Sequence, residues 1–227
     1  HEAYMKDQLE STCEKEFTKY KNFMKVEFGI VIDECKFDRD PSFNETFADF
    51  LRSIGVHPDT AGANDHDRLG PIETYWESWY TNTCAARLCA NLDETYWKFA
   101  SEMYNHAYNR LPHDGNEGSI SPYEWLTYSS PDCGHLKVPF SPSYVVQPKT
   151  KQTNMRCRAK KGMFCGYPKD TSDGIYTHYF PQTRSTQDSR HCVMDEYYGV
   201  RHEATPEQLK EREAELLKLV AELEERC

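Results

Sequence analysis

The 227-residue chain is acidic and polar, yet rich in aromatic residues. Its 27 lysine and arginine residues face 37 aspartate and glutamate residues, so the formal net charge is −10, and the mean hydropathy is −0.84. This charge disfavours a general nucleic-acid binder, which needs a basic face against phosphate, and the short apolar runs exclude a membrane-spanning helix. Aromatic residues make up 13% of the chain, which excludes disorder throughout.

The N-terminal half has the periodicity of helices. Four stretches place apolar residues at three- and four-residue steps, which predicts a helix in each. They are residues 1–28, 43–55, 73–91 and 93–111. Gly55 ends the second stretch and Pro112 ends the fourth. Residues 56–71, rich in Asp, His and Gly, are expected to form a loop. We therefore predict a helical domain over residues 1–126.

The remainder of the chain has a different character. Residues 127–202 carry many Pro, Gly, Ser, Thr and Tyr residues with little periodicity, which predicts an irregular segment held by disulfides. A basic run over residues 156–161 is interpreted as a solvated face or as a salt-bridge partner. Residues 203–227 begin with Thr205-Pro206-Glu207-Gln208, which has the residues of a capping box, and an amphipathic helix is expected to follow. The expected fold is mainly α.

The C-terminal helix is expected to bury one apolar seam. Five residues share this seam at heptad-like spacing, which favours docking on a partner chain. They are Leu209, Leu216, Val220, Leu223 and Cys227. Docking of the helix on its own domain is the alternative.

The cysteine count indicates an oxidising compartment. The nine cysteines form no CxxC pair, and their wide spacing suits disulfides, with one cysteine left over. Asn44 begins the glycosylation sequon Asn44-Glu45-Thr46. We therefore expect a secreted, disulfide-bonded, oligomeric glycoprotein. The alternatives are a reduced protein with buried cysteines and an intracellular component of a large assembly.

Two stretches have the layout of a twelve-residue calcium loop. In residues 113–124, Gly118 stands sixth, Ile120 eighth and Glu124 twelfth, and Glu117 adds an early carboxylate. A weaker loop lies upstream, with Asp65 first and Asp67 third. Calcium is the expected cofactor. The expected ligands are Glu117 and Glu124, followed by Asp65 and Asp67.

Residues 43–134 resemble the sarcoplasmic calcium-binding proteins and the calcium-regulated photoproteins. The resemblance rests on a Leu-x-x-x-Gly phrase ending at Gly55, an aromatic exit helix over residues 75–80, and the Glu124-Trp125 phrase. It implies a pair of EF-hand-like loops with degenerate ligand sets.

No enzyme motif stands out, because the chain lacks HExxH, GxSxG, GxxxxGK[ST] and GxGxxG. We expect a non-catalytic, secreted structural or binding protein, with a degenerate calcium module that assembles with partner chains. Other protein chains are the expected partners, through residues 205–227, and nucleic acid is not. One alternative is a secreted hydrolase or metal enzyme that uses the Asp/His-rich loop at residues 57–67. The other is an accessory subunit of a large multiprotein assembly.

Overall fold

The computed structural model describes residues 10–37, 43, 45–60, 70–147, 158–168 and 174–197, together with six residues between 210 and 221. The chain divides into two compact units. The first comprises residues 1–78 and 112–130, and the second comprises residues 79–111 and 131–227. Each unit is described by itself.

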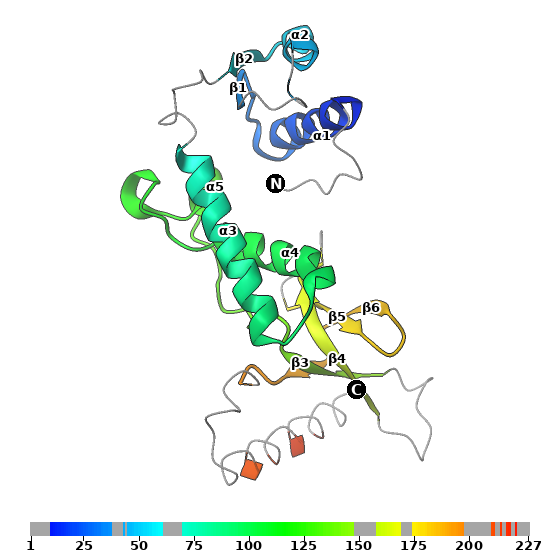
Figure 1. Cartoon of the computed structure of the whole chain (residues 1–227). Coiled ribbons are helices and arrows are strands. Elements are labelled where there is room, and N and C mark those ends of the chain that lie inside the picture. Colours follow the sequence, from blue (N-terminus) through cyan, green and yellow to red (C-terminus); the bar gives the residue numbers. More distant parts are fainter. Residues whose placement is uncertain are drawn as a thin grey trace. The chain divides into compact units, whose positions relative to one another are not determined.

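The first unit contains a small helical and parallel-strand core (Figure 1). Its N-terminal elements are α1 (Glu10–Phe28), β1 (Glu34–Phe37), α2 (Glu45–Ser53) and β2 (His57–Thr60). The two strands pair in parallel, with Glu34 opposite His57. Aromatic rings dominate the packing, because Phe47 meets Phe17 and Phe37 edge to face. The buried core residues are Cys13, Phe37, Phe47, Ala48, Leu51 and Val56.

Helix α2 ends where the sequence predicts. Gly55 adopts a left-handed φ of +76°, which a residue without Cβ accommodates at little cost. The Val56 amide then donates to the Leu51 carbonyl at 2.9 Å, which satisfies an otherwise free carbonyl of the last turn. The side-chain amine of Lys21 on α1 donates to the Ile54 carbonyl and ties the two helices together.

Further helices follow. Helix α3 runs from Gly70 to Cys89, and its residues after Ser78 belong to the second unit. The first unit holds the 3-10 helix η3 (Glu117–Ser119) and the short helix α5 (Pro122–Thr127). The second unit begins its own core with the 3-10 helix η2 (Glu94–Tyr96) and α4 (Trp97–Tyr108).

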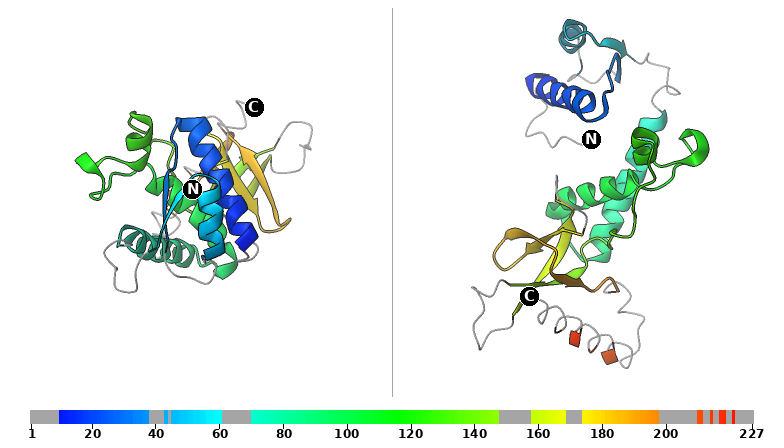
Figure 2. Two further views of the ribbon diagram at one scale, coloured as in Figure 1. Left: turned by 90° about the horizontal axis from the view of Figure 1, so that it is seen from above. Right: turned by 180° about the vertical axis from the view of Figure 1, so that it is seen from behind.

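The second unit is built around a five-stranded antiparallel sheet with the order β6-β5-β4-β3-β7. Figures 1 and 2 show α4 lying against this sheet, in agreement with its contacts to β4. The strands are β3 (Pro142–Val146), β4 (Ala159–Gly166), β5 (Tyr176–Phe180), β6 (Ser185–Ser189) and β7 (Cys192–Met194).

The register places residues far apart in sequence side by side. Ser143 on β3 lies opposite Gly162 on β4 and also opposite Met194 on β7. Helix α4 joins the sheet in one core, whose buried members are Ala100, Met103, Phe140 and Phe164.

The sheet contradicts the expected mainly α fold with an irregular second half. Its strands are short, and several of their buried positions hold small or polar residues. Ser143 on β3, Gly162 on β4 and His178 on β5 are all buried. A strand whose inward residues are not apolar lacks the alternating pattern by which sequence analysis finds strands. Residues 57–60, expected in a loop, likewise form β2.

The four N-terminal helices are confirmed within the described residues, with shifted ends. The expected C-terminal helix is described at residues 210, 211, 214, 217, 218 and 221, which are helical. All five residues of the expected seam lie outside the described residues, and the seam stays a prediction.

The cysteines depart from the expectation of disulfides. None of the seven cysteines in the described part is joined in a disulfide, and Cys13 and Cys165 are buried. A buried thiol acts as a small apolar residue and needs no partner. Burial raises the pKa of Cys165 to about 12, so that this thiol stays protonated and inert. The other two cysteines, Cys157 and Cys227, lie outside the described residues.

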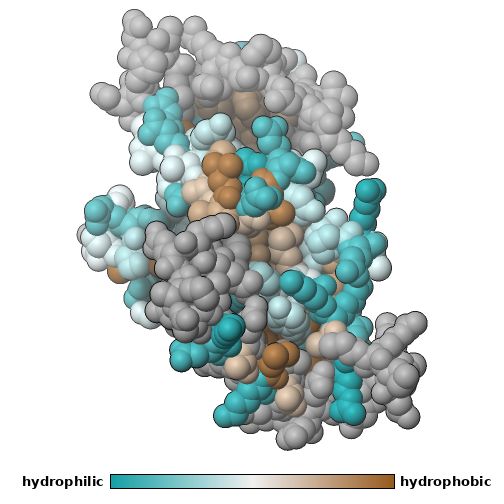
Figure 3. Space-filling model, turned by 60° about the horizontal axis from the view of Figure 1, so that its bottom comes forward, coloured by the Kyte–Doolittle hydropathy of each residue, from teal (hydrophilic) through white to brown (hydrophobic). Residues whose placement is uncertain are grey.

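In the face shown in Figure 3, hydrophilic residues cover much of the described surface, and hydrophobic residues show between them. Within the described part, none of the helices combines the length and the apolar character that crossing a membrane requires.

Candidate functional site

Basic side chains gather at one end of the five-stranded sheet. Arg158 and Lys161 are exposed at the start of β4, and Arg184 is exposed in the turn between β5 and β6. Lys160 joins these segments, because its amine lies 3.9 Å from the centre of the Phe180 ring and donates to the Thr183 hydroxyl at 3.2 Å. This packing holds the Lys160 stem and fixes the turn beside the strand.

This basic end, defined as Arg158, Lys160, Lys161 and Arg184, carries uncompensated charge. None of the four forms a salt bridge with a carboxylate of the described residues. Arg184 does act on Tyr96, at the start of α4. Burial raises the pKa of Tyr96, and the Arg184 charge opposes that shift. Four cations at one end of the sheet, without acidic partners among the described residues, make this end attractive to an anion.

The interior beneath this end holds a buried polar pair. His178 on β5 and Ser143 on β3 are both fully buried, and the His178 Nδ1 lies 2.9 Å from the Ser143 hydroxyl. Ser143 lies opposite Gly162 and His178 lies opposite Phe164, so the pair joins β3 and β5 across the intervening strand β4. Burial lowers the pKa of His178 to about 4, while the backbone of Ser189 and the Asp188 carboxylate act in the opposite direction.

A second histidine pair fastens α4 to the sheet. The Nε2 atoms of His106 on α4 and His135 lie 2.8 Å apart, so one of them carries the shared hydrogen. The His106 ring stacks on Tyr167, which follows β4, with ring centres 3.8 Å apart. Burial lowers the pKa of His106 to about 3, and the charges of Arg110 and His135 add to the effect. The His106 ring is therefore neutral at physiological pH.

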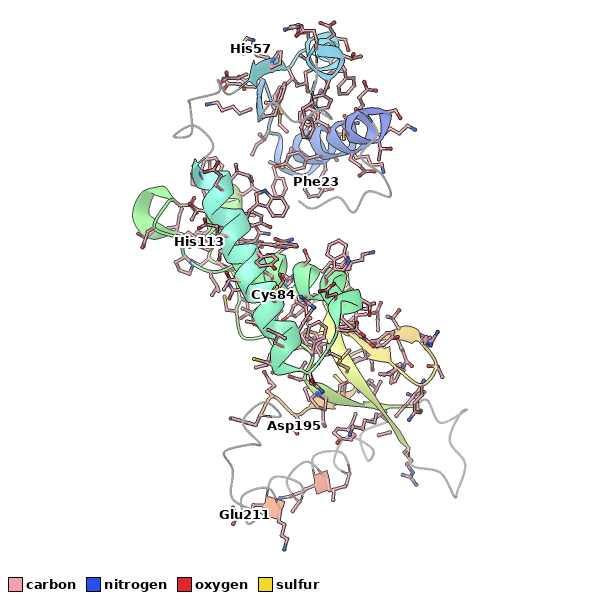
Figure 4. All side chains as sticks on the ribbon, in the orientation of Figure 1. Phe23, His57, Cys84, His113, Asp195 and Glu211 are labelled. Carbon is pink, nitrogen blue, oxygen red and sulfur yellow. The ribbon has the colours of Figure 1, made fainter. Side chains whose placement is uncertain are left out.

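A set of polar contacts lies at the other end of the sheet, where β3 begins and β7 ends. The Lys137 amine pairs with the Glu196 carboxylate at 2.9 Å, and the second oxygen of Glu196 accepts from the Val138 amide at 3.1 Å. Asp195, labelled in Figure 4, donates its backbone N–H to the Pro142 carbonyl at 2.9 Å. These bonds hold the segment after β7 against the loop that leads into β3.

The loop at residues 113–124 does not have the geometry expected of an EF-hand. His113, labelled in Figure 4, donates its amide hydrogen to the Ile120 carbonyl, and Asn116 donates its side-chain amide to the same oxygen. Ile120 is thus engaged within its own loop. Glu124 accepts a hydrogen bond from the Ser130 hydroxyl at 2.8 Å.

The other expected ligands give no described cluster. The Glu117 side chain, Asp65 and Asp67 lie outside the described residues, as does the sequon residue Asn44. Among the described residues, no three His, Cys, Asp or Glu side chains are arranged to hold a metal ion. Calcium binding through the four carboxylates stays a prediction. Of the alternative loop at residues 57–67, only residues 57–60, on β2, are described.

Sequence analysis identified part of this basic end but not its proximity to Arg184. The run over residues 156–161 was interpreted as a solvated face against an acidic background. The net charge of this segment, calculated separately from that of the whole chain, is the sequence signal that distinguishes the basic end.

The comparisons with known proteins concern this same part of the chain. Residues 141–207 match the family model of the retroviral polymerase SH3-like domain, which is fewer than a third of the residues. No curated protein matches. The chain is similar to a cryo-EM structure of the simian T-cell lymphotropic virus intasome in complex with PP2A regulatory subunit B56 gamma. That likeness has 12% identity and a TM-score of 0.41, and covers 82% of this chain and 63% of that chain.

These findings correct the expected identity. The resemblance to calcium-binding proteins is wrong, as are the secreted location and the calcium-module function. The segment that matches the retroviral polymerase SH3-like domain model coincides with the sheet that was expected to be irregular. The expectations that the chain has protein partners and that it is not a catalyst concern the whole protein, and both stay predictions. The functional argument below rests on the family match and on the geometry of the second unit.

Proposed function

We propose that the second unit is a nucleic-acid-binding module of a retroviral-type polymerase, and that its basic end contacts the phosphate backbone. One observation carries the proposal. Four cationic side chains without acidic partners among the described residues lie at one end of the sheet, inside the matched segment. As part of such a polymerase, the protein would act inside the cell.

The distribution of charge supports this role. Residues 141–207 hold ten lysine and arginine residues against seven aspartate and glutamate residues, a net charge of +3. Because the net charge of the whole chain is −10, the residues outside this segment have a net charge of −13. The proposal departs from the expectation that nucleic acid is not a partner, which rested on the net charge of the whole chain.

The local geometry supports phosphate contacts rather than base reading. Arg158, Lys161 and Arg184 are exposed, and long flexible cations reach phosphates without regard to sequence. Lys160 is held against Phe180, so the position of its charge is fixed. The proposal assigns this unit a binding role and assigns it no catalytic residue.

The salt dependence of binding tests the proposal. We would titrate a fluorescent DNA duplex with the full chain and follow anisotropy at several salt concentrations. If all four cations meet phosphates, the logarithm of the affinity should fall with the logarithm of salt with a slope of about −3 to −4. The double variant Lys161→Gln, Arg184→Gln should reduce the magnitude of that slope by about 2.

The matched control is Lys15→Gln, Lys25→Gln, which removes the same charge from exposed positions on α1. It should leave the slope unchanged. Equal losses in both double variants would show that total charge alone decides binding, and the proposal would then be rejected. Absence of salt-dependent binding by the unaltered chain would reject it as well.

A further inference from the structure

The first unit displays aromatic rings on an acidic stretch. From residue 112 to residue 130 the sequence has no lysine or arginine but three carboxylates. Within that stretch, Trp125 on α5 is 57% exposed, and Tyr128, which caps the helix, is 95% exposed. Neither ring stacks on another aromatic ring of the described residues. Large exposed aromatic side chains of this kind commonly anchor protein interfaces.

The rings stand on a rigid support. The Ser121 hydroxyl, itself almost fully buried, accepts from the Glu124 amide at 3.0 Å and caps the start of α5. At the other end, the Tyr128 amide donates to the Glu124 carbonyl at 2.8 Å. The Ser130 hydroxyl binds the Glu124 carboxylate, so the following chain is fastened to the same residue. A ligand would therefore meet rings whose backbone is already ordered.

The charge of the stretch selects the kind of ligand. The carboxylates, with no cation among them, repel phosphate and so disfavour nucleic acid. A cationic side chain satisfies both features at once, because it is attracted to the carboxylates and stacks on an aromatic face. Arginine does so better than lysine, since its planar and weakly hydrated guanidinium stacks on rings.

We propose that Trp125, Tyr128 and Glu124 form a docking surface for an arginine-bearing segment of a partner protein. This surface lies in the first unit and is independent of the nucleic-acid role proposed for the second.

The test measures binding of two fluorescent peptides, nona-arginine and nona-lysine, to the full chain by anisotropy. The arginine peptide should bind several-fold more tightly than the lysine peptide. Trp125→Ala and Tyr128→Ala should each lower the affinity for the arginine peptide about fivefold. Trp125→Phe and Tyr128→Phe keep a ring at each position and should retain most of the affinity, which separates a lost ring from a misfolded chain.

Two controls separate this surface from attraction by the net charge of −10. Tyr80→Ala removes a 66% exposed ring from α3, and Glu77→Gln removes an exposed carboxylate from the same helix. Tyr80→Ala should lower the affinity for the arginine peptide less than Tyr128→Ala does. Glu77→Gln should likewise lower it less than Glu124→Gln does. Equal losses, or equal affinity for the two peptides, would overturn the proposal. So would a DNA oligomer or a second copy of the chain whose binding depends on Trp125.

Discussion

Acid should destabilise the second unit through His178. Its imidazole is fully buried against Ser143, and its pKa in the folded chain is about 4, against an ordinary value of 6.5. Because folding lowers this pKa, the folded state favours the neutral ring. The stabilisation is complete above about pH 6.5 and is lost as the pH falls towards 4. The difference in pKa corresponds to about 3 kcal/mol, of which about 2 kcal/mol should be lost by pH 5.

The perturbation that isolates this effect is His178→Asn, whose amide does not titrate. We would measure hydrogen exchange of amides in β3, β4 and β5 on the full chain at pH 7 and pH 5. The unaltered chain should lose about 2 kcal/mol more protection between these values than the variant does. All other histidines are the same in both proteins, so the difference between the two removes their contribution.

The exposed His191, in the turn before β7, provides the matched control. His191→Asn should keep the pH dependence of the unaltered chain. If His178→Asn and the unaltered chain lose equal protection between pH 7 and pH 5, the reasoning from burial and pKa is refuted.

Three further changes test the packing. Gly162→Ala should destabilise the sheet by about 1–3 kcal/mol in chemical denaturation, because a Cβ there would lie 2.8 Å from the buried Phe180 ring; unchanged stability would show that the ring moves freely. Leu51→Ala, at a fully buried position of the first unit, should cost about 2–5 kcal/mol by the same measurement, and a loss below 1 kcal/mol would contradict that core. Alkylation of the denatured, unreduced chain should label at least seven cysteines by mass; six or fewer would indicate disulfides.

The helices of the first unit were accessible from the sequence because their buried residues are apolar. Phe47 and Leu51 are four residues apart on one face of α2, and both lie in the core. Gly55 marks the end of that helix through its left-handed backbone. Periodicity and the stop signal agree here, so local sequence decides the structure.

The sheet was not accessible for the converse reason. Its centre is lined by Ser143, Gly162 and His178, none of which reads as a core residue. The His178 Nδ1 and the Ser143 hydroxyl share one buried hydrogen bond, and this pairing joins strands far apart in sequence. A hydrogen bond of that kind leaves no periodic signal.

The candidate site could be predicted from the sequence only in part. The basic run was visible, but its proximity to Arg184 depends on the contact between Lys160 and Thr183. The EF-hand interpretation was wrong for a related reason. The spacing of Gly118, Ile120 and Glu124 matches a ligand loop, whereas the hydrogen bonds of Ile120 and Glu124 are made within their own segment.

The pairing of β7 with β3 has a consequence for how the protein can be made and cut. Strand β3 lies between β4 and β7, so one of its edges is covered only by the last strand of the sheet. During synthesis, that edge stays open until Met194 has left the ribosome. A chain truncated at residue 190 would keep it open permanently, and an unpaired strand edge is a template for aggregation. We expect shortened versions of the protein to stay in solution only when they extend past Asp195.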